Sequence, residues 1–344
     1  IIVTGDHKLT AKAIVSELGL KVDEKNILEG SDLDKISDDD LVKKISAIDI
    51  YARVEPRHKL RIIKAWREKG EVVAMTGDGV NDAPALKAAD IGIALGSGTD
   101  VAKETSDLIL LDNNFKTIVA AVERGRVIFD NIRKVILYLL ADAFSEIVLI
   151  TGALILFLPL PILPAQIIWV NLIADGLPNL ALTFEKGEKE VMADKPRKKK
   201  EKILNKEMKT LIFIIGVTTD IILLGLFYIL FNLNNQNILH IRTVIFAAIG
   251  IDSLIYVFSC RSLRHSVFTK NPFENKYLIA AVIIGLFLQI IAVYHPYLQK
   301  IFETMPLTAA DWLLVASLAV MKLIAIEISK HHFIVKKSQA QINI

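Results

Sequence analysis

Long apolar runs dominate the chain from about residue 135 onward, and they constrain its fold more than any other feature. Each run has about 18–23 residues, enough for a helix to cross the roughly 30 Å hydrocarbon core of a bilayer. Because lipid offers the backbone no hydrogen-bond partners, such runs fold as helices that satisfy their own amides. The sequence therefore predicts an all-α bundle of six transmembrane helices, at about residues 136–158, 163–183, 209–231, 242–260, 277–295 and 311–329.

The loops between these runs differ in their content of Lys and Arg. Segments 188–209, 260–276 and 330–337 are rich in both residues, whereas the alternate loops contain few. The positive-inside rule therefore places the basic loops and both ends of the chain in the cytosol, including a tail at 330–344. We expect the lysine run 198–200 to contact lipid headgroups. As the membrane, we favour the plasma membrane.

Residues 1–125 have the charge density of a globular domain and alternate between two patterns. Short apolar runs rich in β-branched residues predict strands at 1–5, 50–54, 71–75, 91–96 and 108–111. Helical patterns separate them at 10–18, 56–70 and 83–89. This alternation predicts an α/β domain with a Rossmann-type parallel sheet that is covered on both faces. From Phe115 one unbroken helical pattern then predicts a stalk at 115–135 that continues into the first apolar run.

Overall charge and cysteine content exclude some classes of protein. The net charge of +3 is too small to indicate a nucleic-acid partner. A single cysteine, Cys260, excludes an internal disulfide and fits a reducing cytosol. Because the chain opens on "IIVTGD", a strand and its turn without an initiator Met, we expect it to be the C-terminal part of a longer protein.

Polar segments follow three of the predicted strands, and ligands of parallel sheets bind at the carboxyl ends of strands. "TGD" at 4–6 follows the first strand, and Asp78 and Asp82 lie four residues apart after another. Two carboxylates at a strand end suit Mg²⁺, which also takes phosphate oxygens and water. Lys59, near the start of the 56–70 helix, places an ammonium where a phosphate can meet it. Together these residues predict a magnesium-dependent phosphoryl-transfer site.

We assign no catalytic role to two features near these residues, the segment 96–99 and His58. We interpret "GSGT" at 96–99 as a tight turn, although its composition is also typical of phosphate-binding loops. His58 is interpreted as a solvated helix residue and not as a catalyst.

Carboxylates inside the apolar runs are costly in lipid, so each is a functional candidate. Glu146 lies in the first run, and Asn171 and Asp175 lie four residues apart in the second. Gly176 and Pro178 follow and are expected to loosen that helix, freeing backbone carbonyls. Carboxylate and amide oxygens suit a hard cation such as Ca²⁺. The alternative is that these groups only form hydrogen bonds between helices, and we favour that alternative for Asp142.

Residues 76–115, "TGDGVNDAPALKAADIGIALGSGTDVAKETSDLILLDNNF", resemble the hinge motif of P-type ion-pumping ATPases, whose phosphorylation domain is of the haloacid-dehalogenase class. "TGD" at 4–6 and "ARVEPRHK" at 52–59 match two further motifs in the order of the family. "IIWVNLIADGLPNLALTFE" at 167–185 resembles the calcium-transporting branch. The resemblance covers nearly the whole chain.

This resemblance implies roles for the polar residues of the first 125 positions. It implies that Asp78 coordinates Mg²⁺, that Asn81 and Asp82 organise the phosphate site, and that Lys59 contacts the phosphoryl group. The remaining residues implied to bind ATP and its phosphate belong to the first polar segment: Thr4, Gly5 and Asp6.

The resemblance also bears on the membrane residues. Glu146, Asn171 and Asp175 match ion ligands of the two-site calcium pumps, whereas Ala143 and Ala174 stand where those pumps have Asn and Thr. Since alanine offers no side-chain oxygen, we expect one Ca²⁺ per cycle and not two. Two further aspartates lie in the apolar runs, Asp220 without an interpretation and Asp252 near an acidic ligand of the family.

Several parts of the family pattern do not occur in this chain. The nucleophilic Asp followed by Lys-Thr-Gly-Thr is absent, as is the Thr-Gly-Glu-Ser loop. Most of the nucleotide-binding domain and the first four membrane helices are also absent. We therefore expect the upstream remainder of the same pump to supply them.

The sequence leaves more than one function open. We favour the C-terminal part of a P-type ATPase that exports Ca²⁺ through an aspartyl-phosphate. Mn²⁺, Na⁺ and H⁺ are alternative cargoes, although a proton needs fewer oxygen ligands. Two functions of a different class are a phosphatase domain fused to an unrelated membrane anchor and a non-catalytic remnant of a pump. The helix that continues into the membrane opposes the first, and the intact hinge motif opposes the second.

Overall fold

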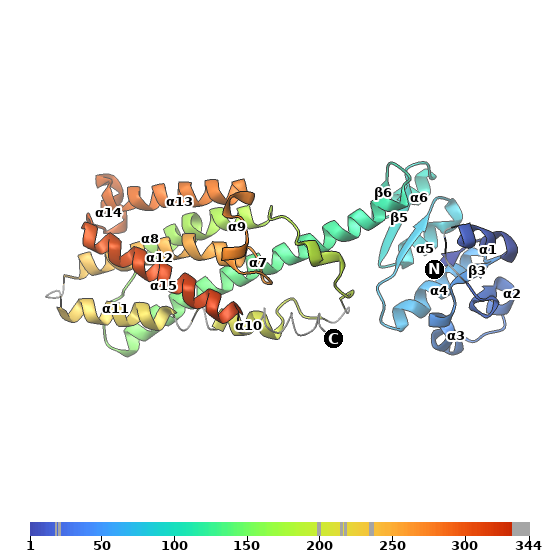
Figure 1. Cartoon of the computed structure of the whole chain (residues 1–344), viewed down its shortest axis with the longest axis horizontal. Helices are drawn as coiled ribbons and strands as arrows, with labels where there is room; N and C mark the ends of the chain where they lie inside the picture. Colours follow the sequence, from blue (N-terminus) through green and yellow to red (C-terminus); the bar gives the residue numbers. More distant parts are fainter. Residues whose placement is uncertain are drawn as a thin grey trace. The chain divides into compact units, whose positions relative to one another are not determined.

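The computed structural model describes residues 1–17, 19, 22–197, 201–213, 216, 219–233 and 237–331 (Figure 1). The chain divides into two compact units, which are described separately: unit 1 contains residues 1–123 and 194–201, and unit 2 contains residues 124–193 and those from 202 onward. The lysine run 198–200 and the tail beyond residue 331 lie outside the described residues, so the predictions about them stay predictions.

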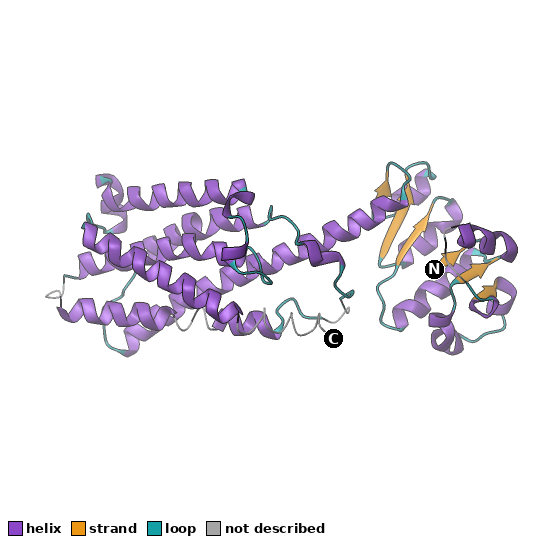
Figure 2. Ribbon diagram, viewed as in Figure 1, coloured by secondary structure: helices purple, strands orange, loops and turns teal. Residues whose placement is uncertain are grey.

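Unit 1 is an α/β unit with two three-stranded parallel sheets (Figure 2). The first has the order β1-β3-β2 and contains β1 (Ile2–Val3), β2 (Ile27–Glu29) and β3 (Ile50–Ala52). The second has the order β4-β5-β6 and contains β4 (Ala74–Gly77), β5 (Ile91–Leu95) and β6 (Leu108–Leu110). All four strand pairs are parallel, which confirms the predicted fold class. The expected single sheet is instead two sheets.

In the part of the chain that the structure describes, the strands form two sheets because β1 and β4 do not pair with each other or with a common strand. Within the described residues, β1 pairs only with β3 and β4 pairs only with β5, so each keeps an unpaired outer edge. A cavity of about 390 Å³ lies beside these edges and is lined by residues of β1, of α4 (Pro56–Glu68) and of β4 with the residues before it.

The helices of unit 1 cover these strands. Besides α4 they are α1 (Lys8–Glu17), α2 (Gly30–Leu33), α3 (Asp38–Lys44), α5 (Ala83–Ala88) and α6 (Asp100–Thr105). Ile62 and Ala65 of α4 pack with Leu33, Leu41 and Tyr51 to form the main core of this unit. α3 begins where Ser37 accepts a hydrogen bond from the Asp40 N–H, which is a helix cap.

Unit 2 is helical. Its long helices are α7 (Phe115–Ile155), which begins before the unit boundary, α12 (Ile238–Cys260), α13 (Lys276–Tyr294) and α15 (Ala309–Lys330). α12 is central and packs against α13 and α15 (Figure 1). Its residues are apolar on all faces and mostly buried, as expected for a helix surrounded by others. The shorter helices are α8 (Pro164–Trp169), α9 (Gly176–Leu182), α10 (Lys206–Phe213), α11 (Thr219–Leu233) and α14 (Pro296–Phe302).

Among the described residues, four helices are long and apolar enough to cross a membrane: α7, α12, α13 and α15. The other two predicted spans are not single helices there. A π-helical segment, η4 (Val170–Asp175), divides the second span into α8 and α9. The third span is divided between α10 and α11, with residues between them outside the description. A multi-pass membrane protein is supported, and the count of six spans stays a prediction.

Candidate functional site

The carboxyl end of β4 carries the first group of candidate residues. Asp82 is buried, and its Oδ2 lies 3.3 Å from the backbone nitrogens of both Asp78 and Gly79, which donate to it. Its Oδ1 accepts a hydrogen bond of 2.6 Å from Lys59 Nζ. The structure thus joins Lys59 and Asp82 directly, and it places Asp78 at the same turn with an exposed side chain.

The backbone around Asp78 is fixed from two sides. A Cβ on Gly77 would lie 2.6 Å from Asp82 Cβ, so only glycine allows the Asp82 side chain to fold back under the turn. Thr99 N–H donates a hydrogen bond of 2.8 Å to the Asp78 carbonyl, and Gly98 N–H donates one of 2.9 Å to the Leu95 carbonyl. The "GSGT" segment is therefore a tight turn, as predicted, and it holds the backbone of Asp78 in place.

Lys59 is positioned by the first turn of α4, and His58 is part of that turn. His58 Nδ1 accepts a hydrogen bond of 3.0 Å from the Glu55 N–H, so its Nε2 carries the proton and donates to Asp34 Oδ1 at 2.9 Å. This hydrogen bond from His58 lowers the pKa of the Asp34 carboxyl. The interpretation of His58 as solvated is wrong, because its side chain is 2% exposed. The His58 side chain therefore caps the start of α4 through Nδ1, and its Nε2–H is bonded to Asp34.

Thr4, Gly5 and Asp6 follow β1 and form a separate polar turn. The Thr4 hydroxyl donates to Asp6 Oδ2 at 3.0 Å and accepts from the Asp6 N–H at 3.1 Å. The Thr4 N–H donates to the Tyr51 carbonyl of β3. Among the described residues, no hydrogen bond joins this turn to the turn after β4. Asn81 is exposed.

In unit 2, α7 and the π-helical segment bring two of the membrane candidates together. Asn171 Nδ2 donates a hydrogen bond of 3.3 Å to Glu146 Oε1. Asn171 is exposed, whereas Asp175 is 1% exposed. The segment that carries both residues, Val170–Asp175, is π-helical and not α-helical. The expectation that Asn171 and Asp175 share one face of the helix stays a prediction.

Asp175 lies in a polar pocket where the helix is loosened. The Tyr138 hydroxyl is 3.3 Å from Asp175 Oδ1 and 2.9 Å from the Ala174 carbonyl. Pro178 has no N–H, and in an α-helix the N–H at this position would bond to the Ala174 carbonyl. That carbonyl is thus available to Tyr138. The predicted freeing of a carbonyl near Asp175 is consistent with this geometry.

Comparison with known proteins assigns both parts of the chain to known families. The family described as "Cation transporting ATPase, C-terminus" matches residues 159–332, about half of the chain. The chain belongs to the cation-transporting P-type ATPases. Two families described as haloacid dehalogenase-like hydrolases match residues 1–90 and 59–122 of this ATPase chain.

Individual relatives of this ATPase chain are calcium-transporting ATPases. That of Bacillus subtilis is 46% identical over 324 residues, covering 93% of the chain and 36% of the relative. Calcium-transporting ATPase 1 of Bacillus cereus is 43% identical over 345 residues, covering 96% and 39%. Calcium-transporting ATPase type 2C member 1 of Homo sapiens is 38% identical over 331 residues, covering 95% and 36%. The chain thus spans little more than a third of the length of these relatives.

The structure of this ATPase chain also shows contacts between helices that the sequence alone did not predict. Ser253 of α12 donates to both oxygens of Asp142, at 2.9 and 3.0 Å. Lys322 of α15 forms an ion pair with Asp252. A lysine in the middle of the last apolar run is costly in lipid, and this signal could have identified Lys322 from the sequence.

Tyr138 was also missed, and the sequence carried no comparable signal for it. Its ring stacks on that of Tyr256 with centroids 4.9 Å apart, and the Tyr256 hydroxyl donates to the Tyr138 carbonyl. These contacts join α7 to α12 and fix the Tyr138 hydroxyl beside Asp175.

Glu185 and Arg261 form a buried ion pair at one end of the ATPase's helices. Arg261 Nη2 and Nε lie 2.9 and 3.1 Å from the two carboxylate oxygens of Glu185, and both side chains are at most 2% exposed. Arg261 Nη1 donates to the carbonyls of Asn271 and Pro272. Asn275 Nδ2 donates to Glu185 Oε2 at 2.9 Å. The segment after α9 is thereby tied to the segment between α12 and α13.

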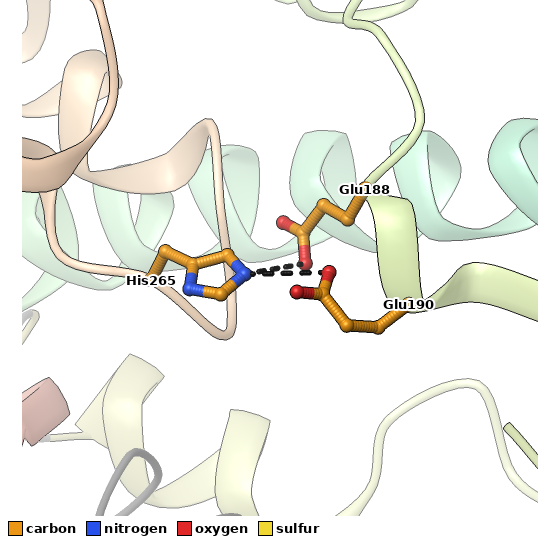
Figure 3. A group of neighbouring side chains, drawn as sticks. All are labelled: Glu188, Glu190 and His265. Atoms are coloured by element: carbon orange, nitrogen blue, oxygen red, sulfur yellow. Dashed lines mark hydrogen bonds and ion pairs between the residues drawn. The ribbon is translucent and has the colours of Figure 1, made fainter. Parts of the chain in front are cut away.

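Glu188, Glu190 and His265 lie close to one another, as Figure 3 shows, and their ligand atoms lie within 4.8 Å of one another. Such a group can hold a metal ion in principle. Here, however, Glu188 already pairs with two cations, Arg264 Nε at 3.3 Å and Lys270 Nζ at 3.6 Å. The surrounding positive charge disfavours a further cation, so we interpret the group as an ion-pair network.

Proposed function

We propose that the chain is the C-terminal part of a calcium pump that couples ATP hydrolysis, through an aspartyl-phosphate, to the export of Ca²⁺. One observation carries this proposal. Carboxylate, amide and carbonyl oxygens gather at a π-helical break within apolar helices, around Asp175, Asn171 and Glu146. Hard cations prefer such oxygen ligands, and a break of this kind in a membrane helix is tolerated where it lines a binding cavity.

The turn after β4 supplies the phosphoryl-transfer residues in this proposal. Lys59 provides a positive charge for the phosphoryl group, and Asp82 holds Lys59 and the Asp78–Gly79 backbone. Asn81 lies exposed at the same turn, where it can reach the phosphate. Thr4, Gly5 and Asp6 contribute a hydroxyl, backbone N–H groups and a carboxylate toward the bound nucleotide. Their role is to position and neutralise charge, which is the main requirement of phosphoryl transfer.

The donor set fits Mg²⁺, with Asp78 as its ligand. Asp82 is committed to Lys59 and to two backbone N–H groups, whereas no described residue donates to the exposed Asp78 carboxylate. Mg²⁺ characteristically takes one or two carboxylates together with phosphate oxygens and water. When bound, it would neutralise phosphate charge. ATP and Mg²⁺ are thus the cofactors of the proposed pump.

The missing partner of unit 1 is, in this proposal, the upstream remainder of the same pump. β1 and β4 each have an unpaired outer edge, and the cavity of about 390 Å³ is lined by elements of both. An upstream strand paired with these edges would unite the two sheets. It would end near Asp78, where a nucleophilic Asp is required.

We further propose that the pump carries one Ca²⁺ per cycle and lies in the plasma membrane, with unit 1 and both ends of the chain in the cytosol. Ala143 and Ala174 supply no side-chain oxygen beside Glu146, so a second complete set of ligands is not available there. The basic loops support the orientation. Lipid is the only other partner proposed, and no nucleic acid.

The test uses the protein with its full upstream sequence, purified and reconstituted in vesicles. We expect ATP-dependent uptake of ⁴⁵Ca²⁺ and a phosphoenzyme that forms only when Ca²⁺ is present. Equilibrium binding should give one Ca²⁺ per phosphorylation site, lost in Asp175→Asn. It should be retained in Glu146→Gln, because Glu146 belongs to the incomplete second set of ligands beside Ala143 and Ala174. Activation by Mn²⁺, Na⁺ or H⁺ in the absence of Ca²⁺ would identify another cargo. Hydrolysis with no cation dependence would indicate a phosphatase on a membrane anchor instead.

A further inference from the structure

A cavity lined partly by aspartates lies inside unit 2. It has a volume of about 190 Å³ and is bordered by α7, α11, α12 and α15. Most of its lining is apolar, and each of the four helices contributes at least one polar or charged residue. These are Asp142, Ser145, Asp220, Asp252, Lys322 and Ser329.

Lys322 is the positively charged residue of this lining. Its Nζ forms an ion pair with Asp252 Oδ2 and lies 4.8 Å from the centroid of the Tyr256 ring, a cation–π distance. The side chain is 6% exposed. Lysines in apolar helices commonly extend their ammonium to the membrane surface. Lys322 lies eight residues before the end of α15 and turns its ammonium inward instead.

The aspartates of the cavity are not fully satisfied by the protein. The Ser145 hydroxyl donates to Asp220 Oδ1, and Ser253 donates to Asp142. Asp220 Oδ2 and Asp252 Oδ1 are buried without a hydrogen-bond partner among the described residues, and Asp220 is 1% exposed. Buried carboxylate oxygens are normally paired, so these two oxygens are potential cation ligands that would become available if the charge of Lys322 were removed.

We propose that the ammonium of Lys322 is a built-in cation that takes the place of a second transported ion. Its positive charge neutralises the Asp252 carboxylate and repels a divalent cation from the cavity. The acidic cluster then stabilises the bundle without binding the transported ion. This inference rests on the proposed calcium pump and adds to it a residue that sets the number of ions. The alanines at 143 and 174 remove ligands, whereas Lys322 excludes a cation by charge.

The test is equilibrium ⁴⁵Ca²⁺ binding to the purified full-length protein, normalised to phosphorylation sites, in the wild type and in Lys322→Met. Methionine keeps the length of the side chain and removes its charge. We expect the ratio to rise from one toward two, because the freed carboxylates can then bind Ca²⁺. Lys322→Gln is a second variant with the same expectation, and its amide can still donate to Asp252 if Lys322→Met does not fold.

Lys330→Met is the matched control. Lys330 is a buried lysine of the same helix that pairs with its own carboxylate, Glu327, at 2.9 Å. Its replacement should leave the ratio at one. A ratio of one in both Lys322 variants would overturn the inference and leave the calcium pump standing. A wild-type ratio of two would overturn the inference as well, and a wild-type ratio near zero would refute the pump itself.

Discussion

Arg261→Met tests how strongly the buried ion pair holds the bundle together. The substitution leaves the Glu185 carboxylate 1% exposed, with the hydrogen bond from Asn275 but without its cation. Removing one partner of a buried ion pair costs about 3–5 kcal/mol. Because one charge-assisted hydrogen bond remains, we expect about 3 kcal/mol. For a unit of about 200 residues this corresponds to a fall of about 6–12 °C in the unfolding midpoint.

The assay is thermal unfolding of the purified full-length protein in detergent, followed by tryptophan fluorescence. Arg261→Met/Glu185→Gln is the informative control, because it removes both charges and keeps the shape of the glutamate side chain. The double variant should be more stable than Arg261→Met, since no uncompensated charge stays buried. A midpoint unchanged in Arg261→Met, or lowest in the double variant, would refute this account of the pair.

Two further predictions concern the turn after β4. Asp78→Asn in the full-length protein should abolish phosphoenzyme formation from ATP while leaving the unfolding midpoint unchanged. The reason is that losing a metal ligand costs on the order of several kcal/mol of transition-state stabilisation. A normal phosphoenzyme level would contradict the role of Asp78. Lys59→Ala and Lys59→Arg should both slow ATP turnover without changing its dependence on Ca²⁺ concentration, since the larger planar guanidinium does not replace the compact ammonium that meets Asp82 at 2.6 Å. A shift in apparent Ca²⁺ affinity as the only effect would exclude Lys59 from the phosphate site.

The local elements of unit 1 were largely predictable from sequence, because their signals are local. Pro56 marks the start of α4, and the glycines of "TGDGVND" mark the turn after β4. Lys59 meets Asp82 although β3 and β4 belong to different sheets, because α4 packs against α5 and against the turn that precedes α5. The division into two sheets was not predictable, since strand pairing depends on which other strands are present. The burial of His58 also depends on a distant residue, Asp34, whose carboxylate accepts the proton of its second nitrogen.

For the residues in the apolar helices, too, contacts between distant parts of the chain could not be predicted from sequence. Charge cost in lipid identifies Glu146 and Asp175 from sequence alone, because any buried carboxylate needs a reason. The π-helical segment Val170–Asp175 was not predicted, and neither was the contrast between the exposed Asn171 and the buried Asp175. The partner of Asp252 is 70 residues away on another helix. Only the packing of α12 against α15 brings Lys322 to it.

The unpaired edges of β1 and β4 also matter for how this polypeptide behaves when it is expressed by itself. Exposed strand edges are templates for pairing with other chains, and they lead to aggregation when nothing covers them. A protein expressed from Ile1 would present two such edges, so we expect self-association and poor solubility of unit 1 even in a well-chosen detergent. In the proposed pump, an upstream segment would emerge first during synthesis on the ribosome. A strand supplied by it would already be present when β1 and β4 form, and the two edges would never face the solvent.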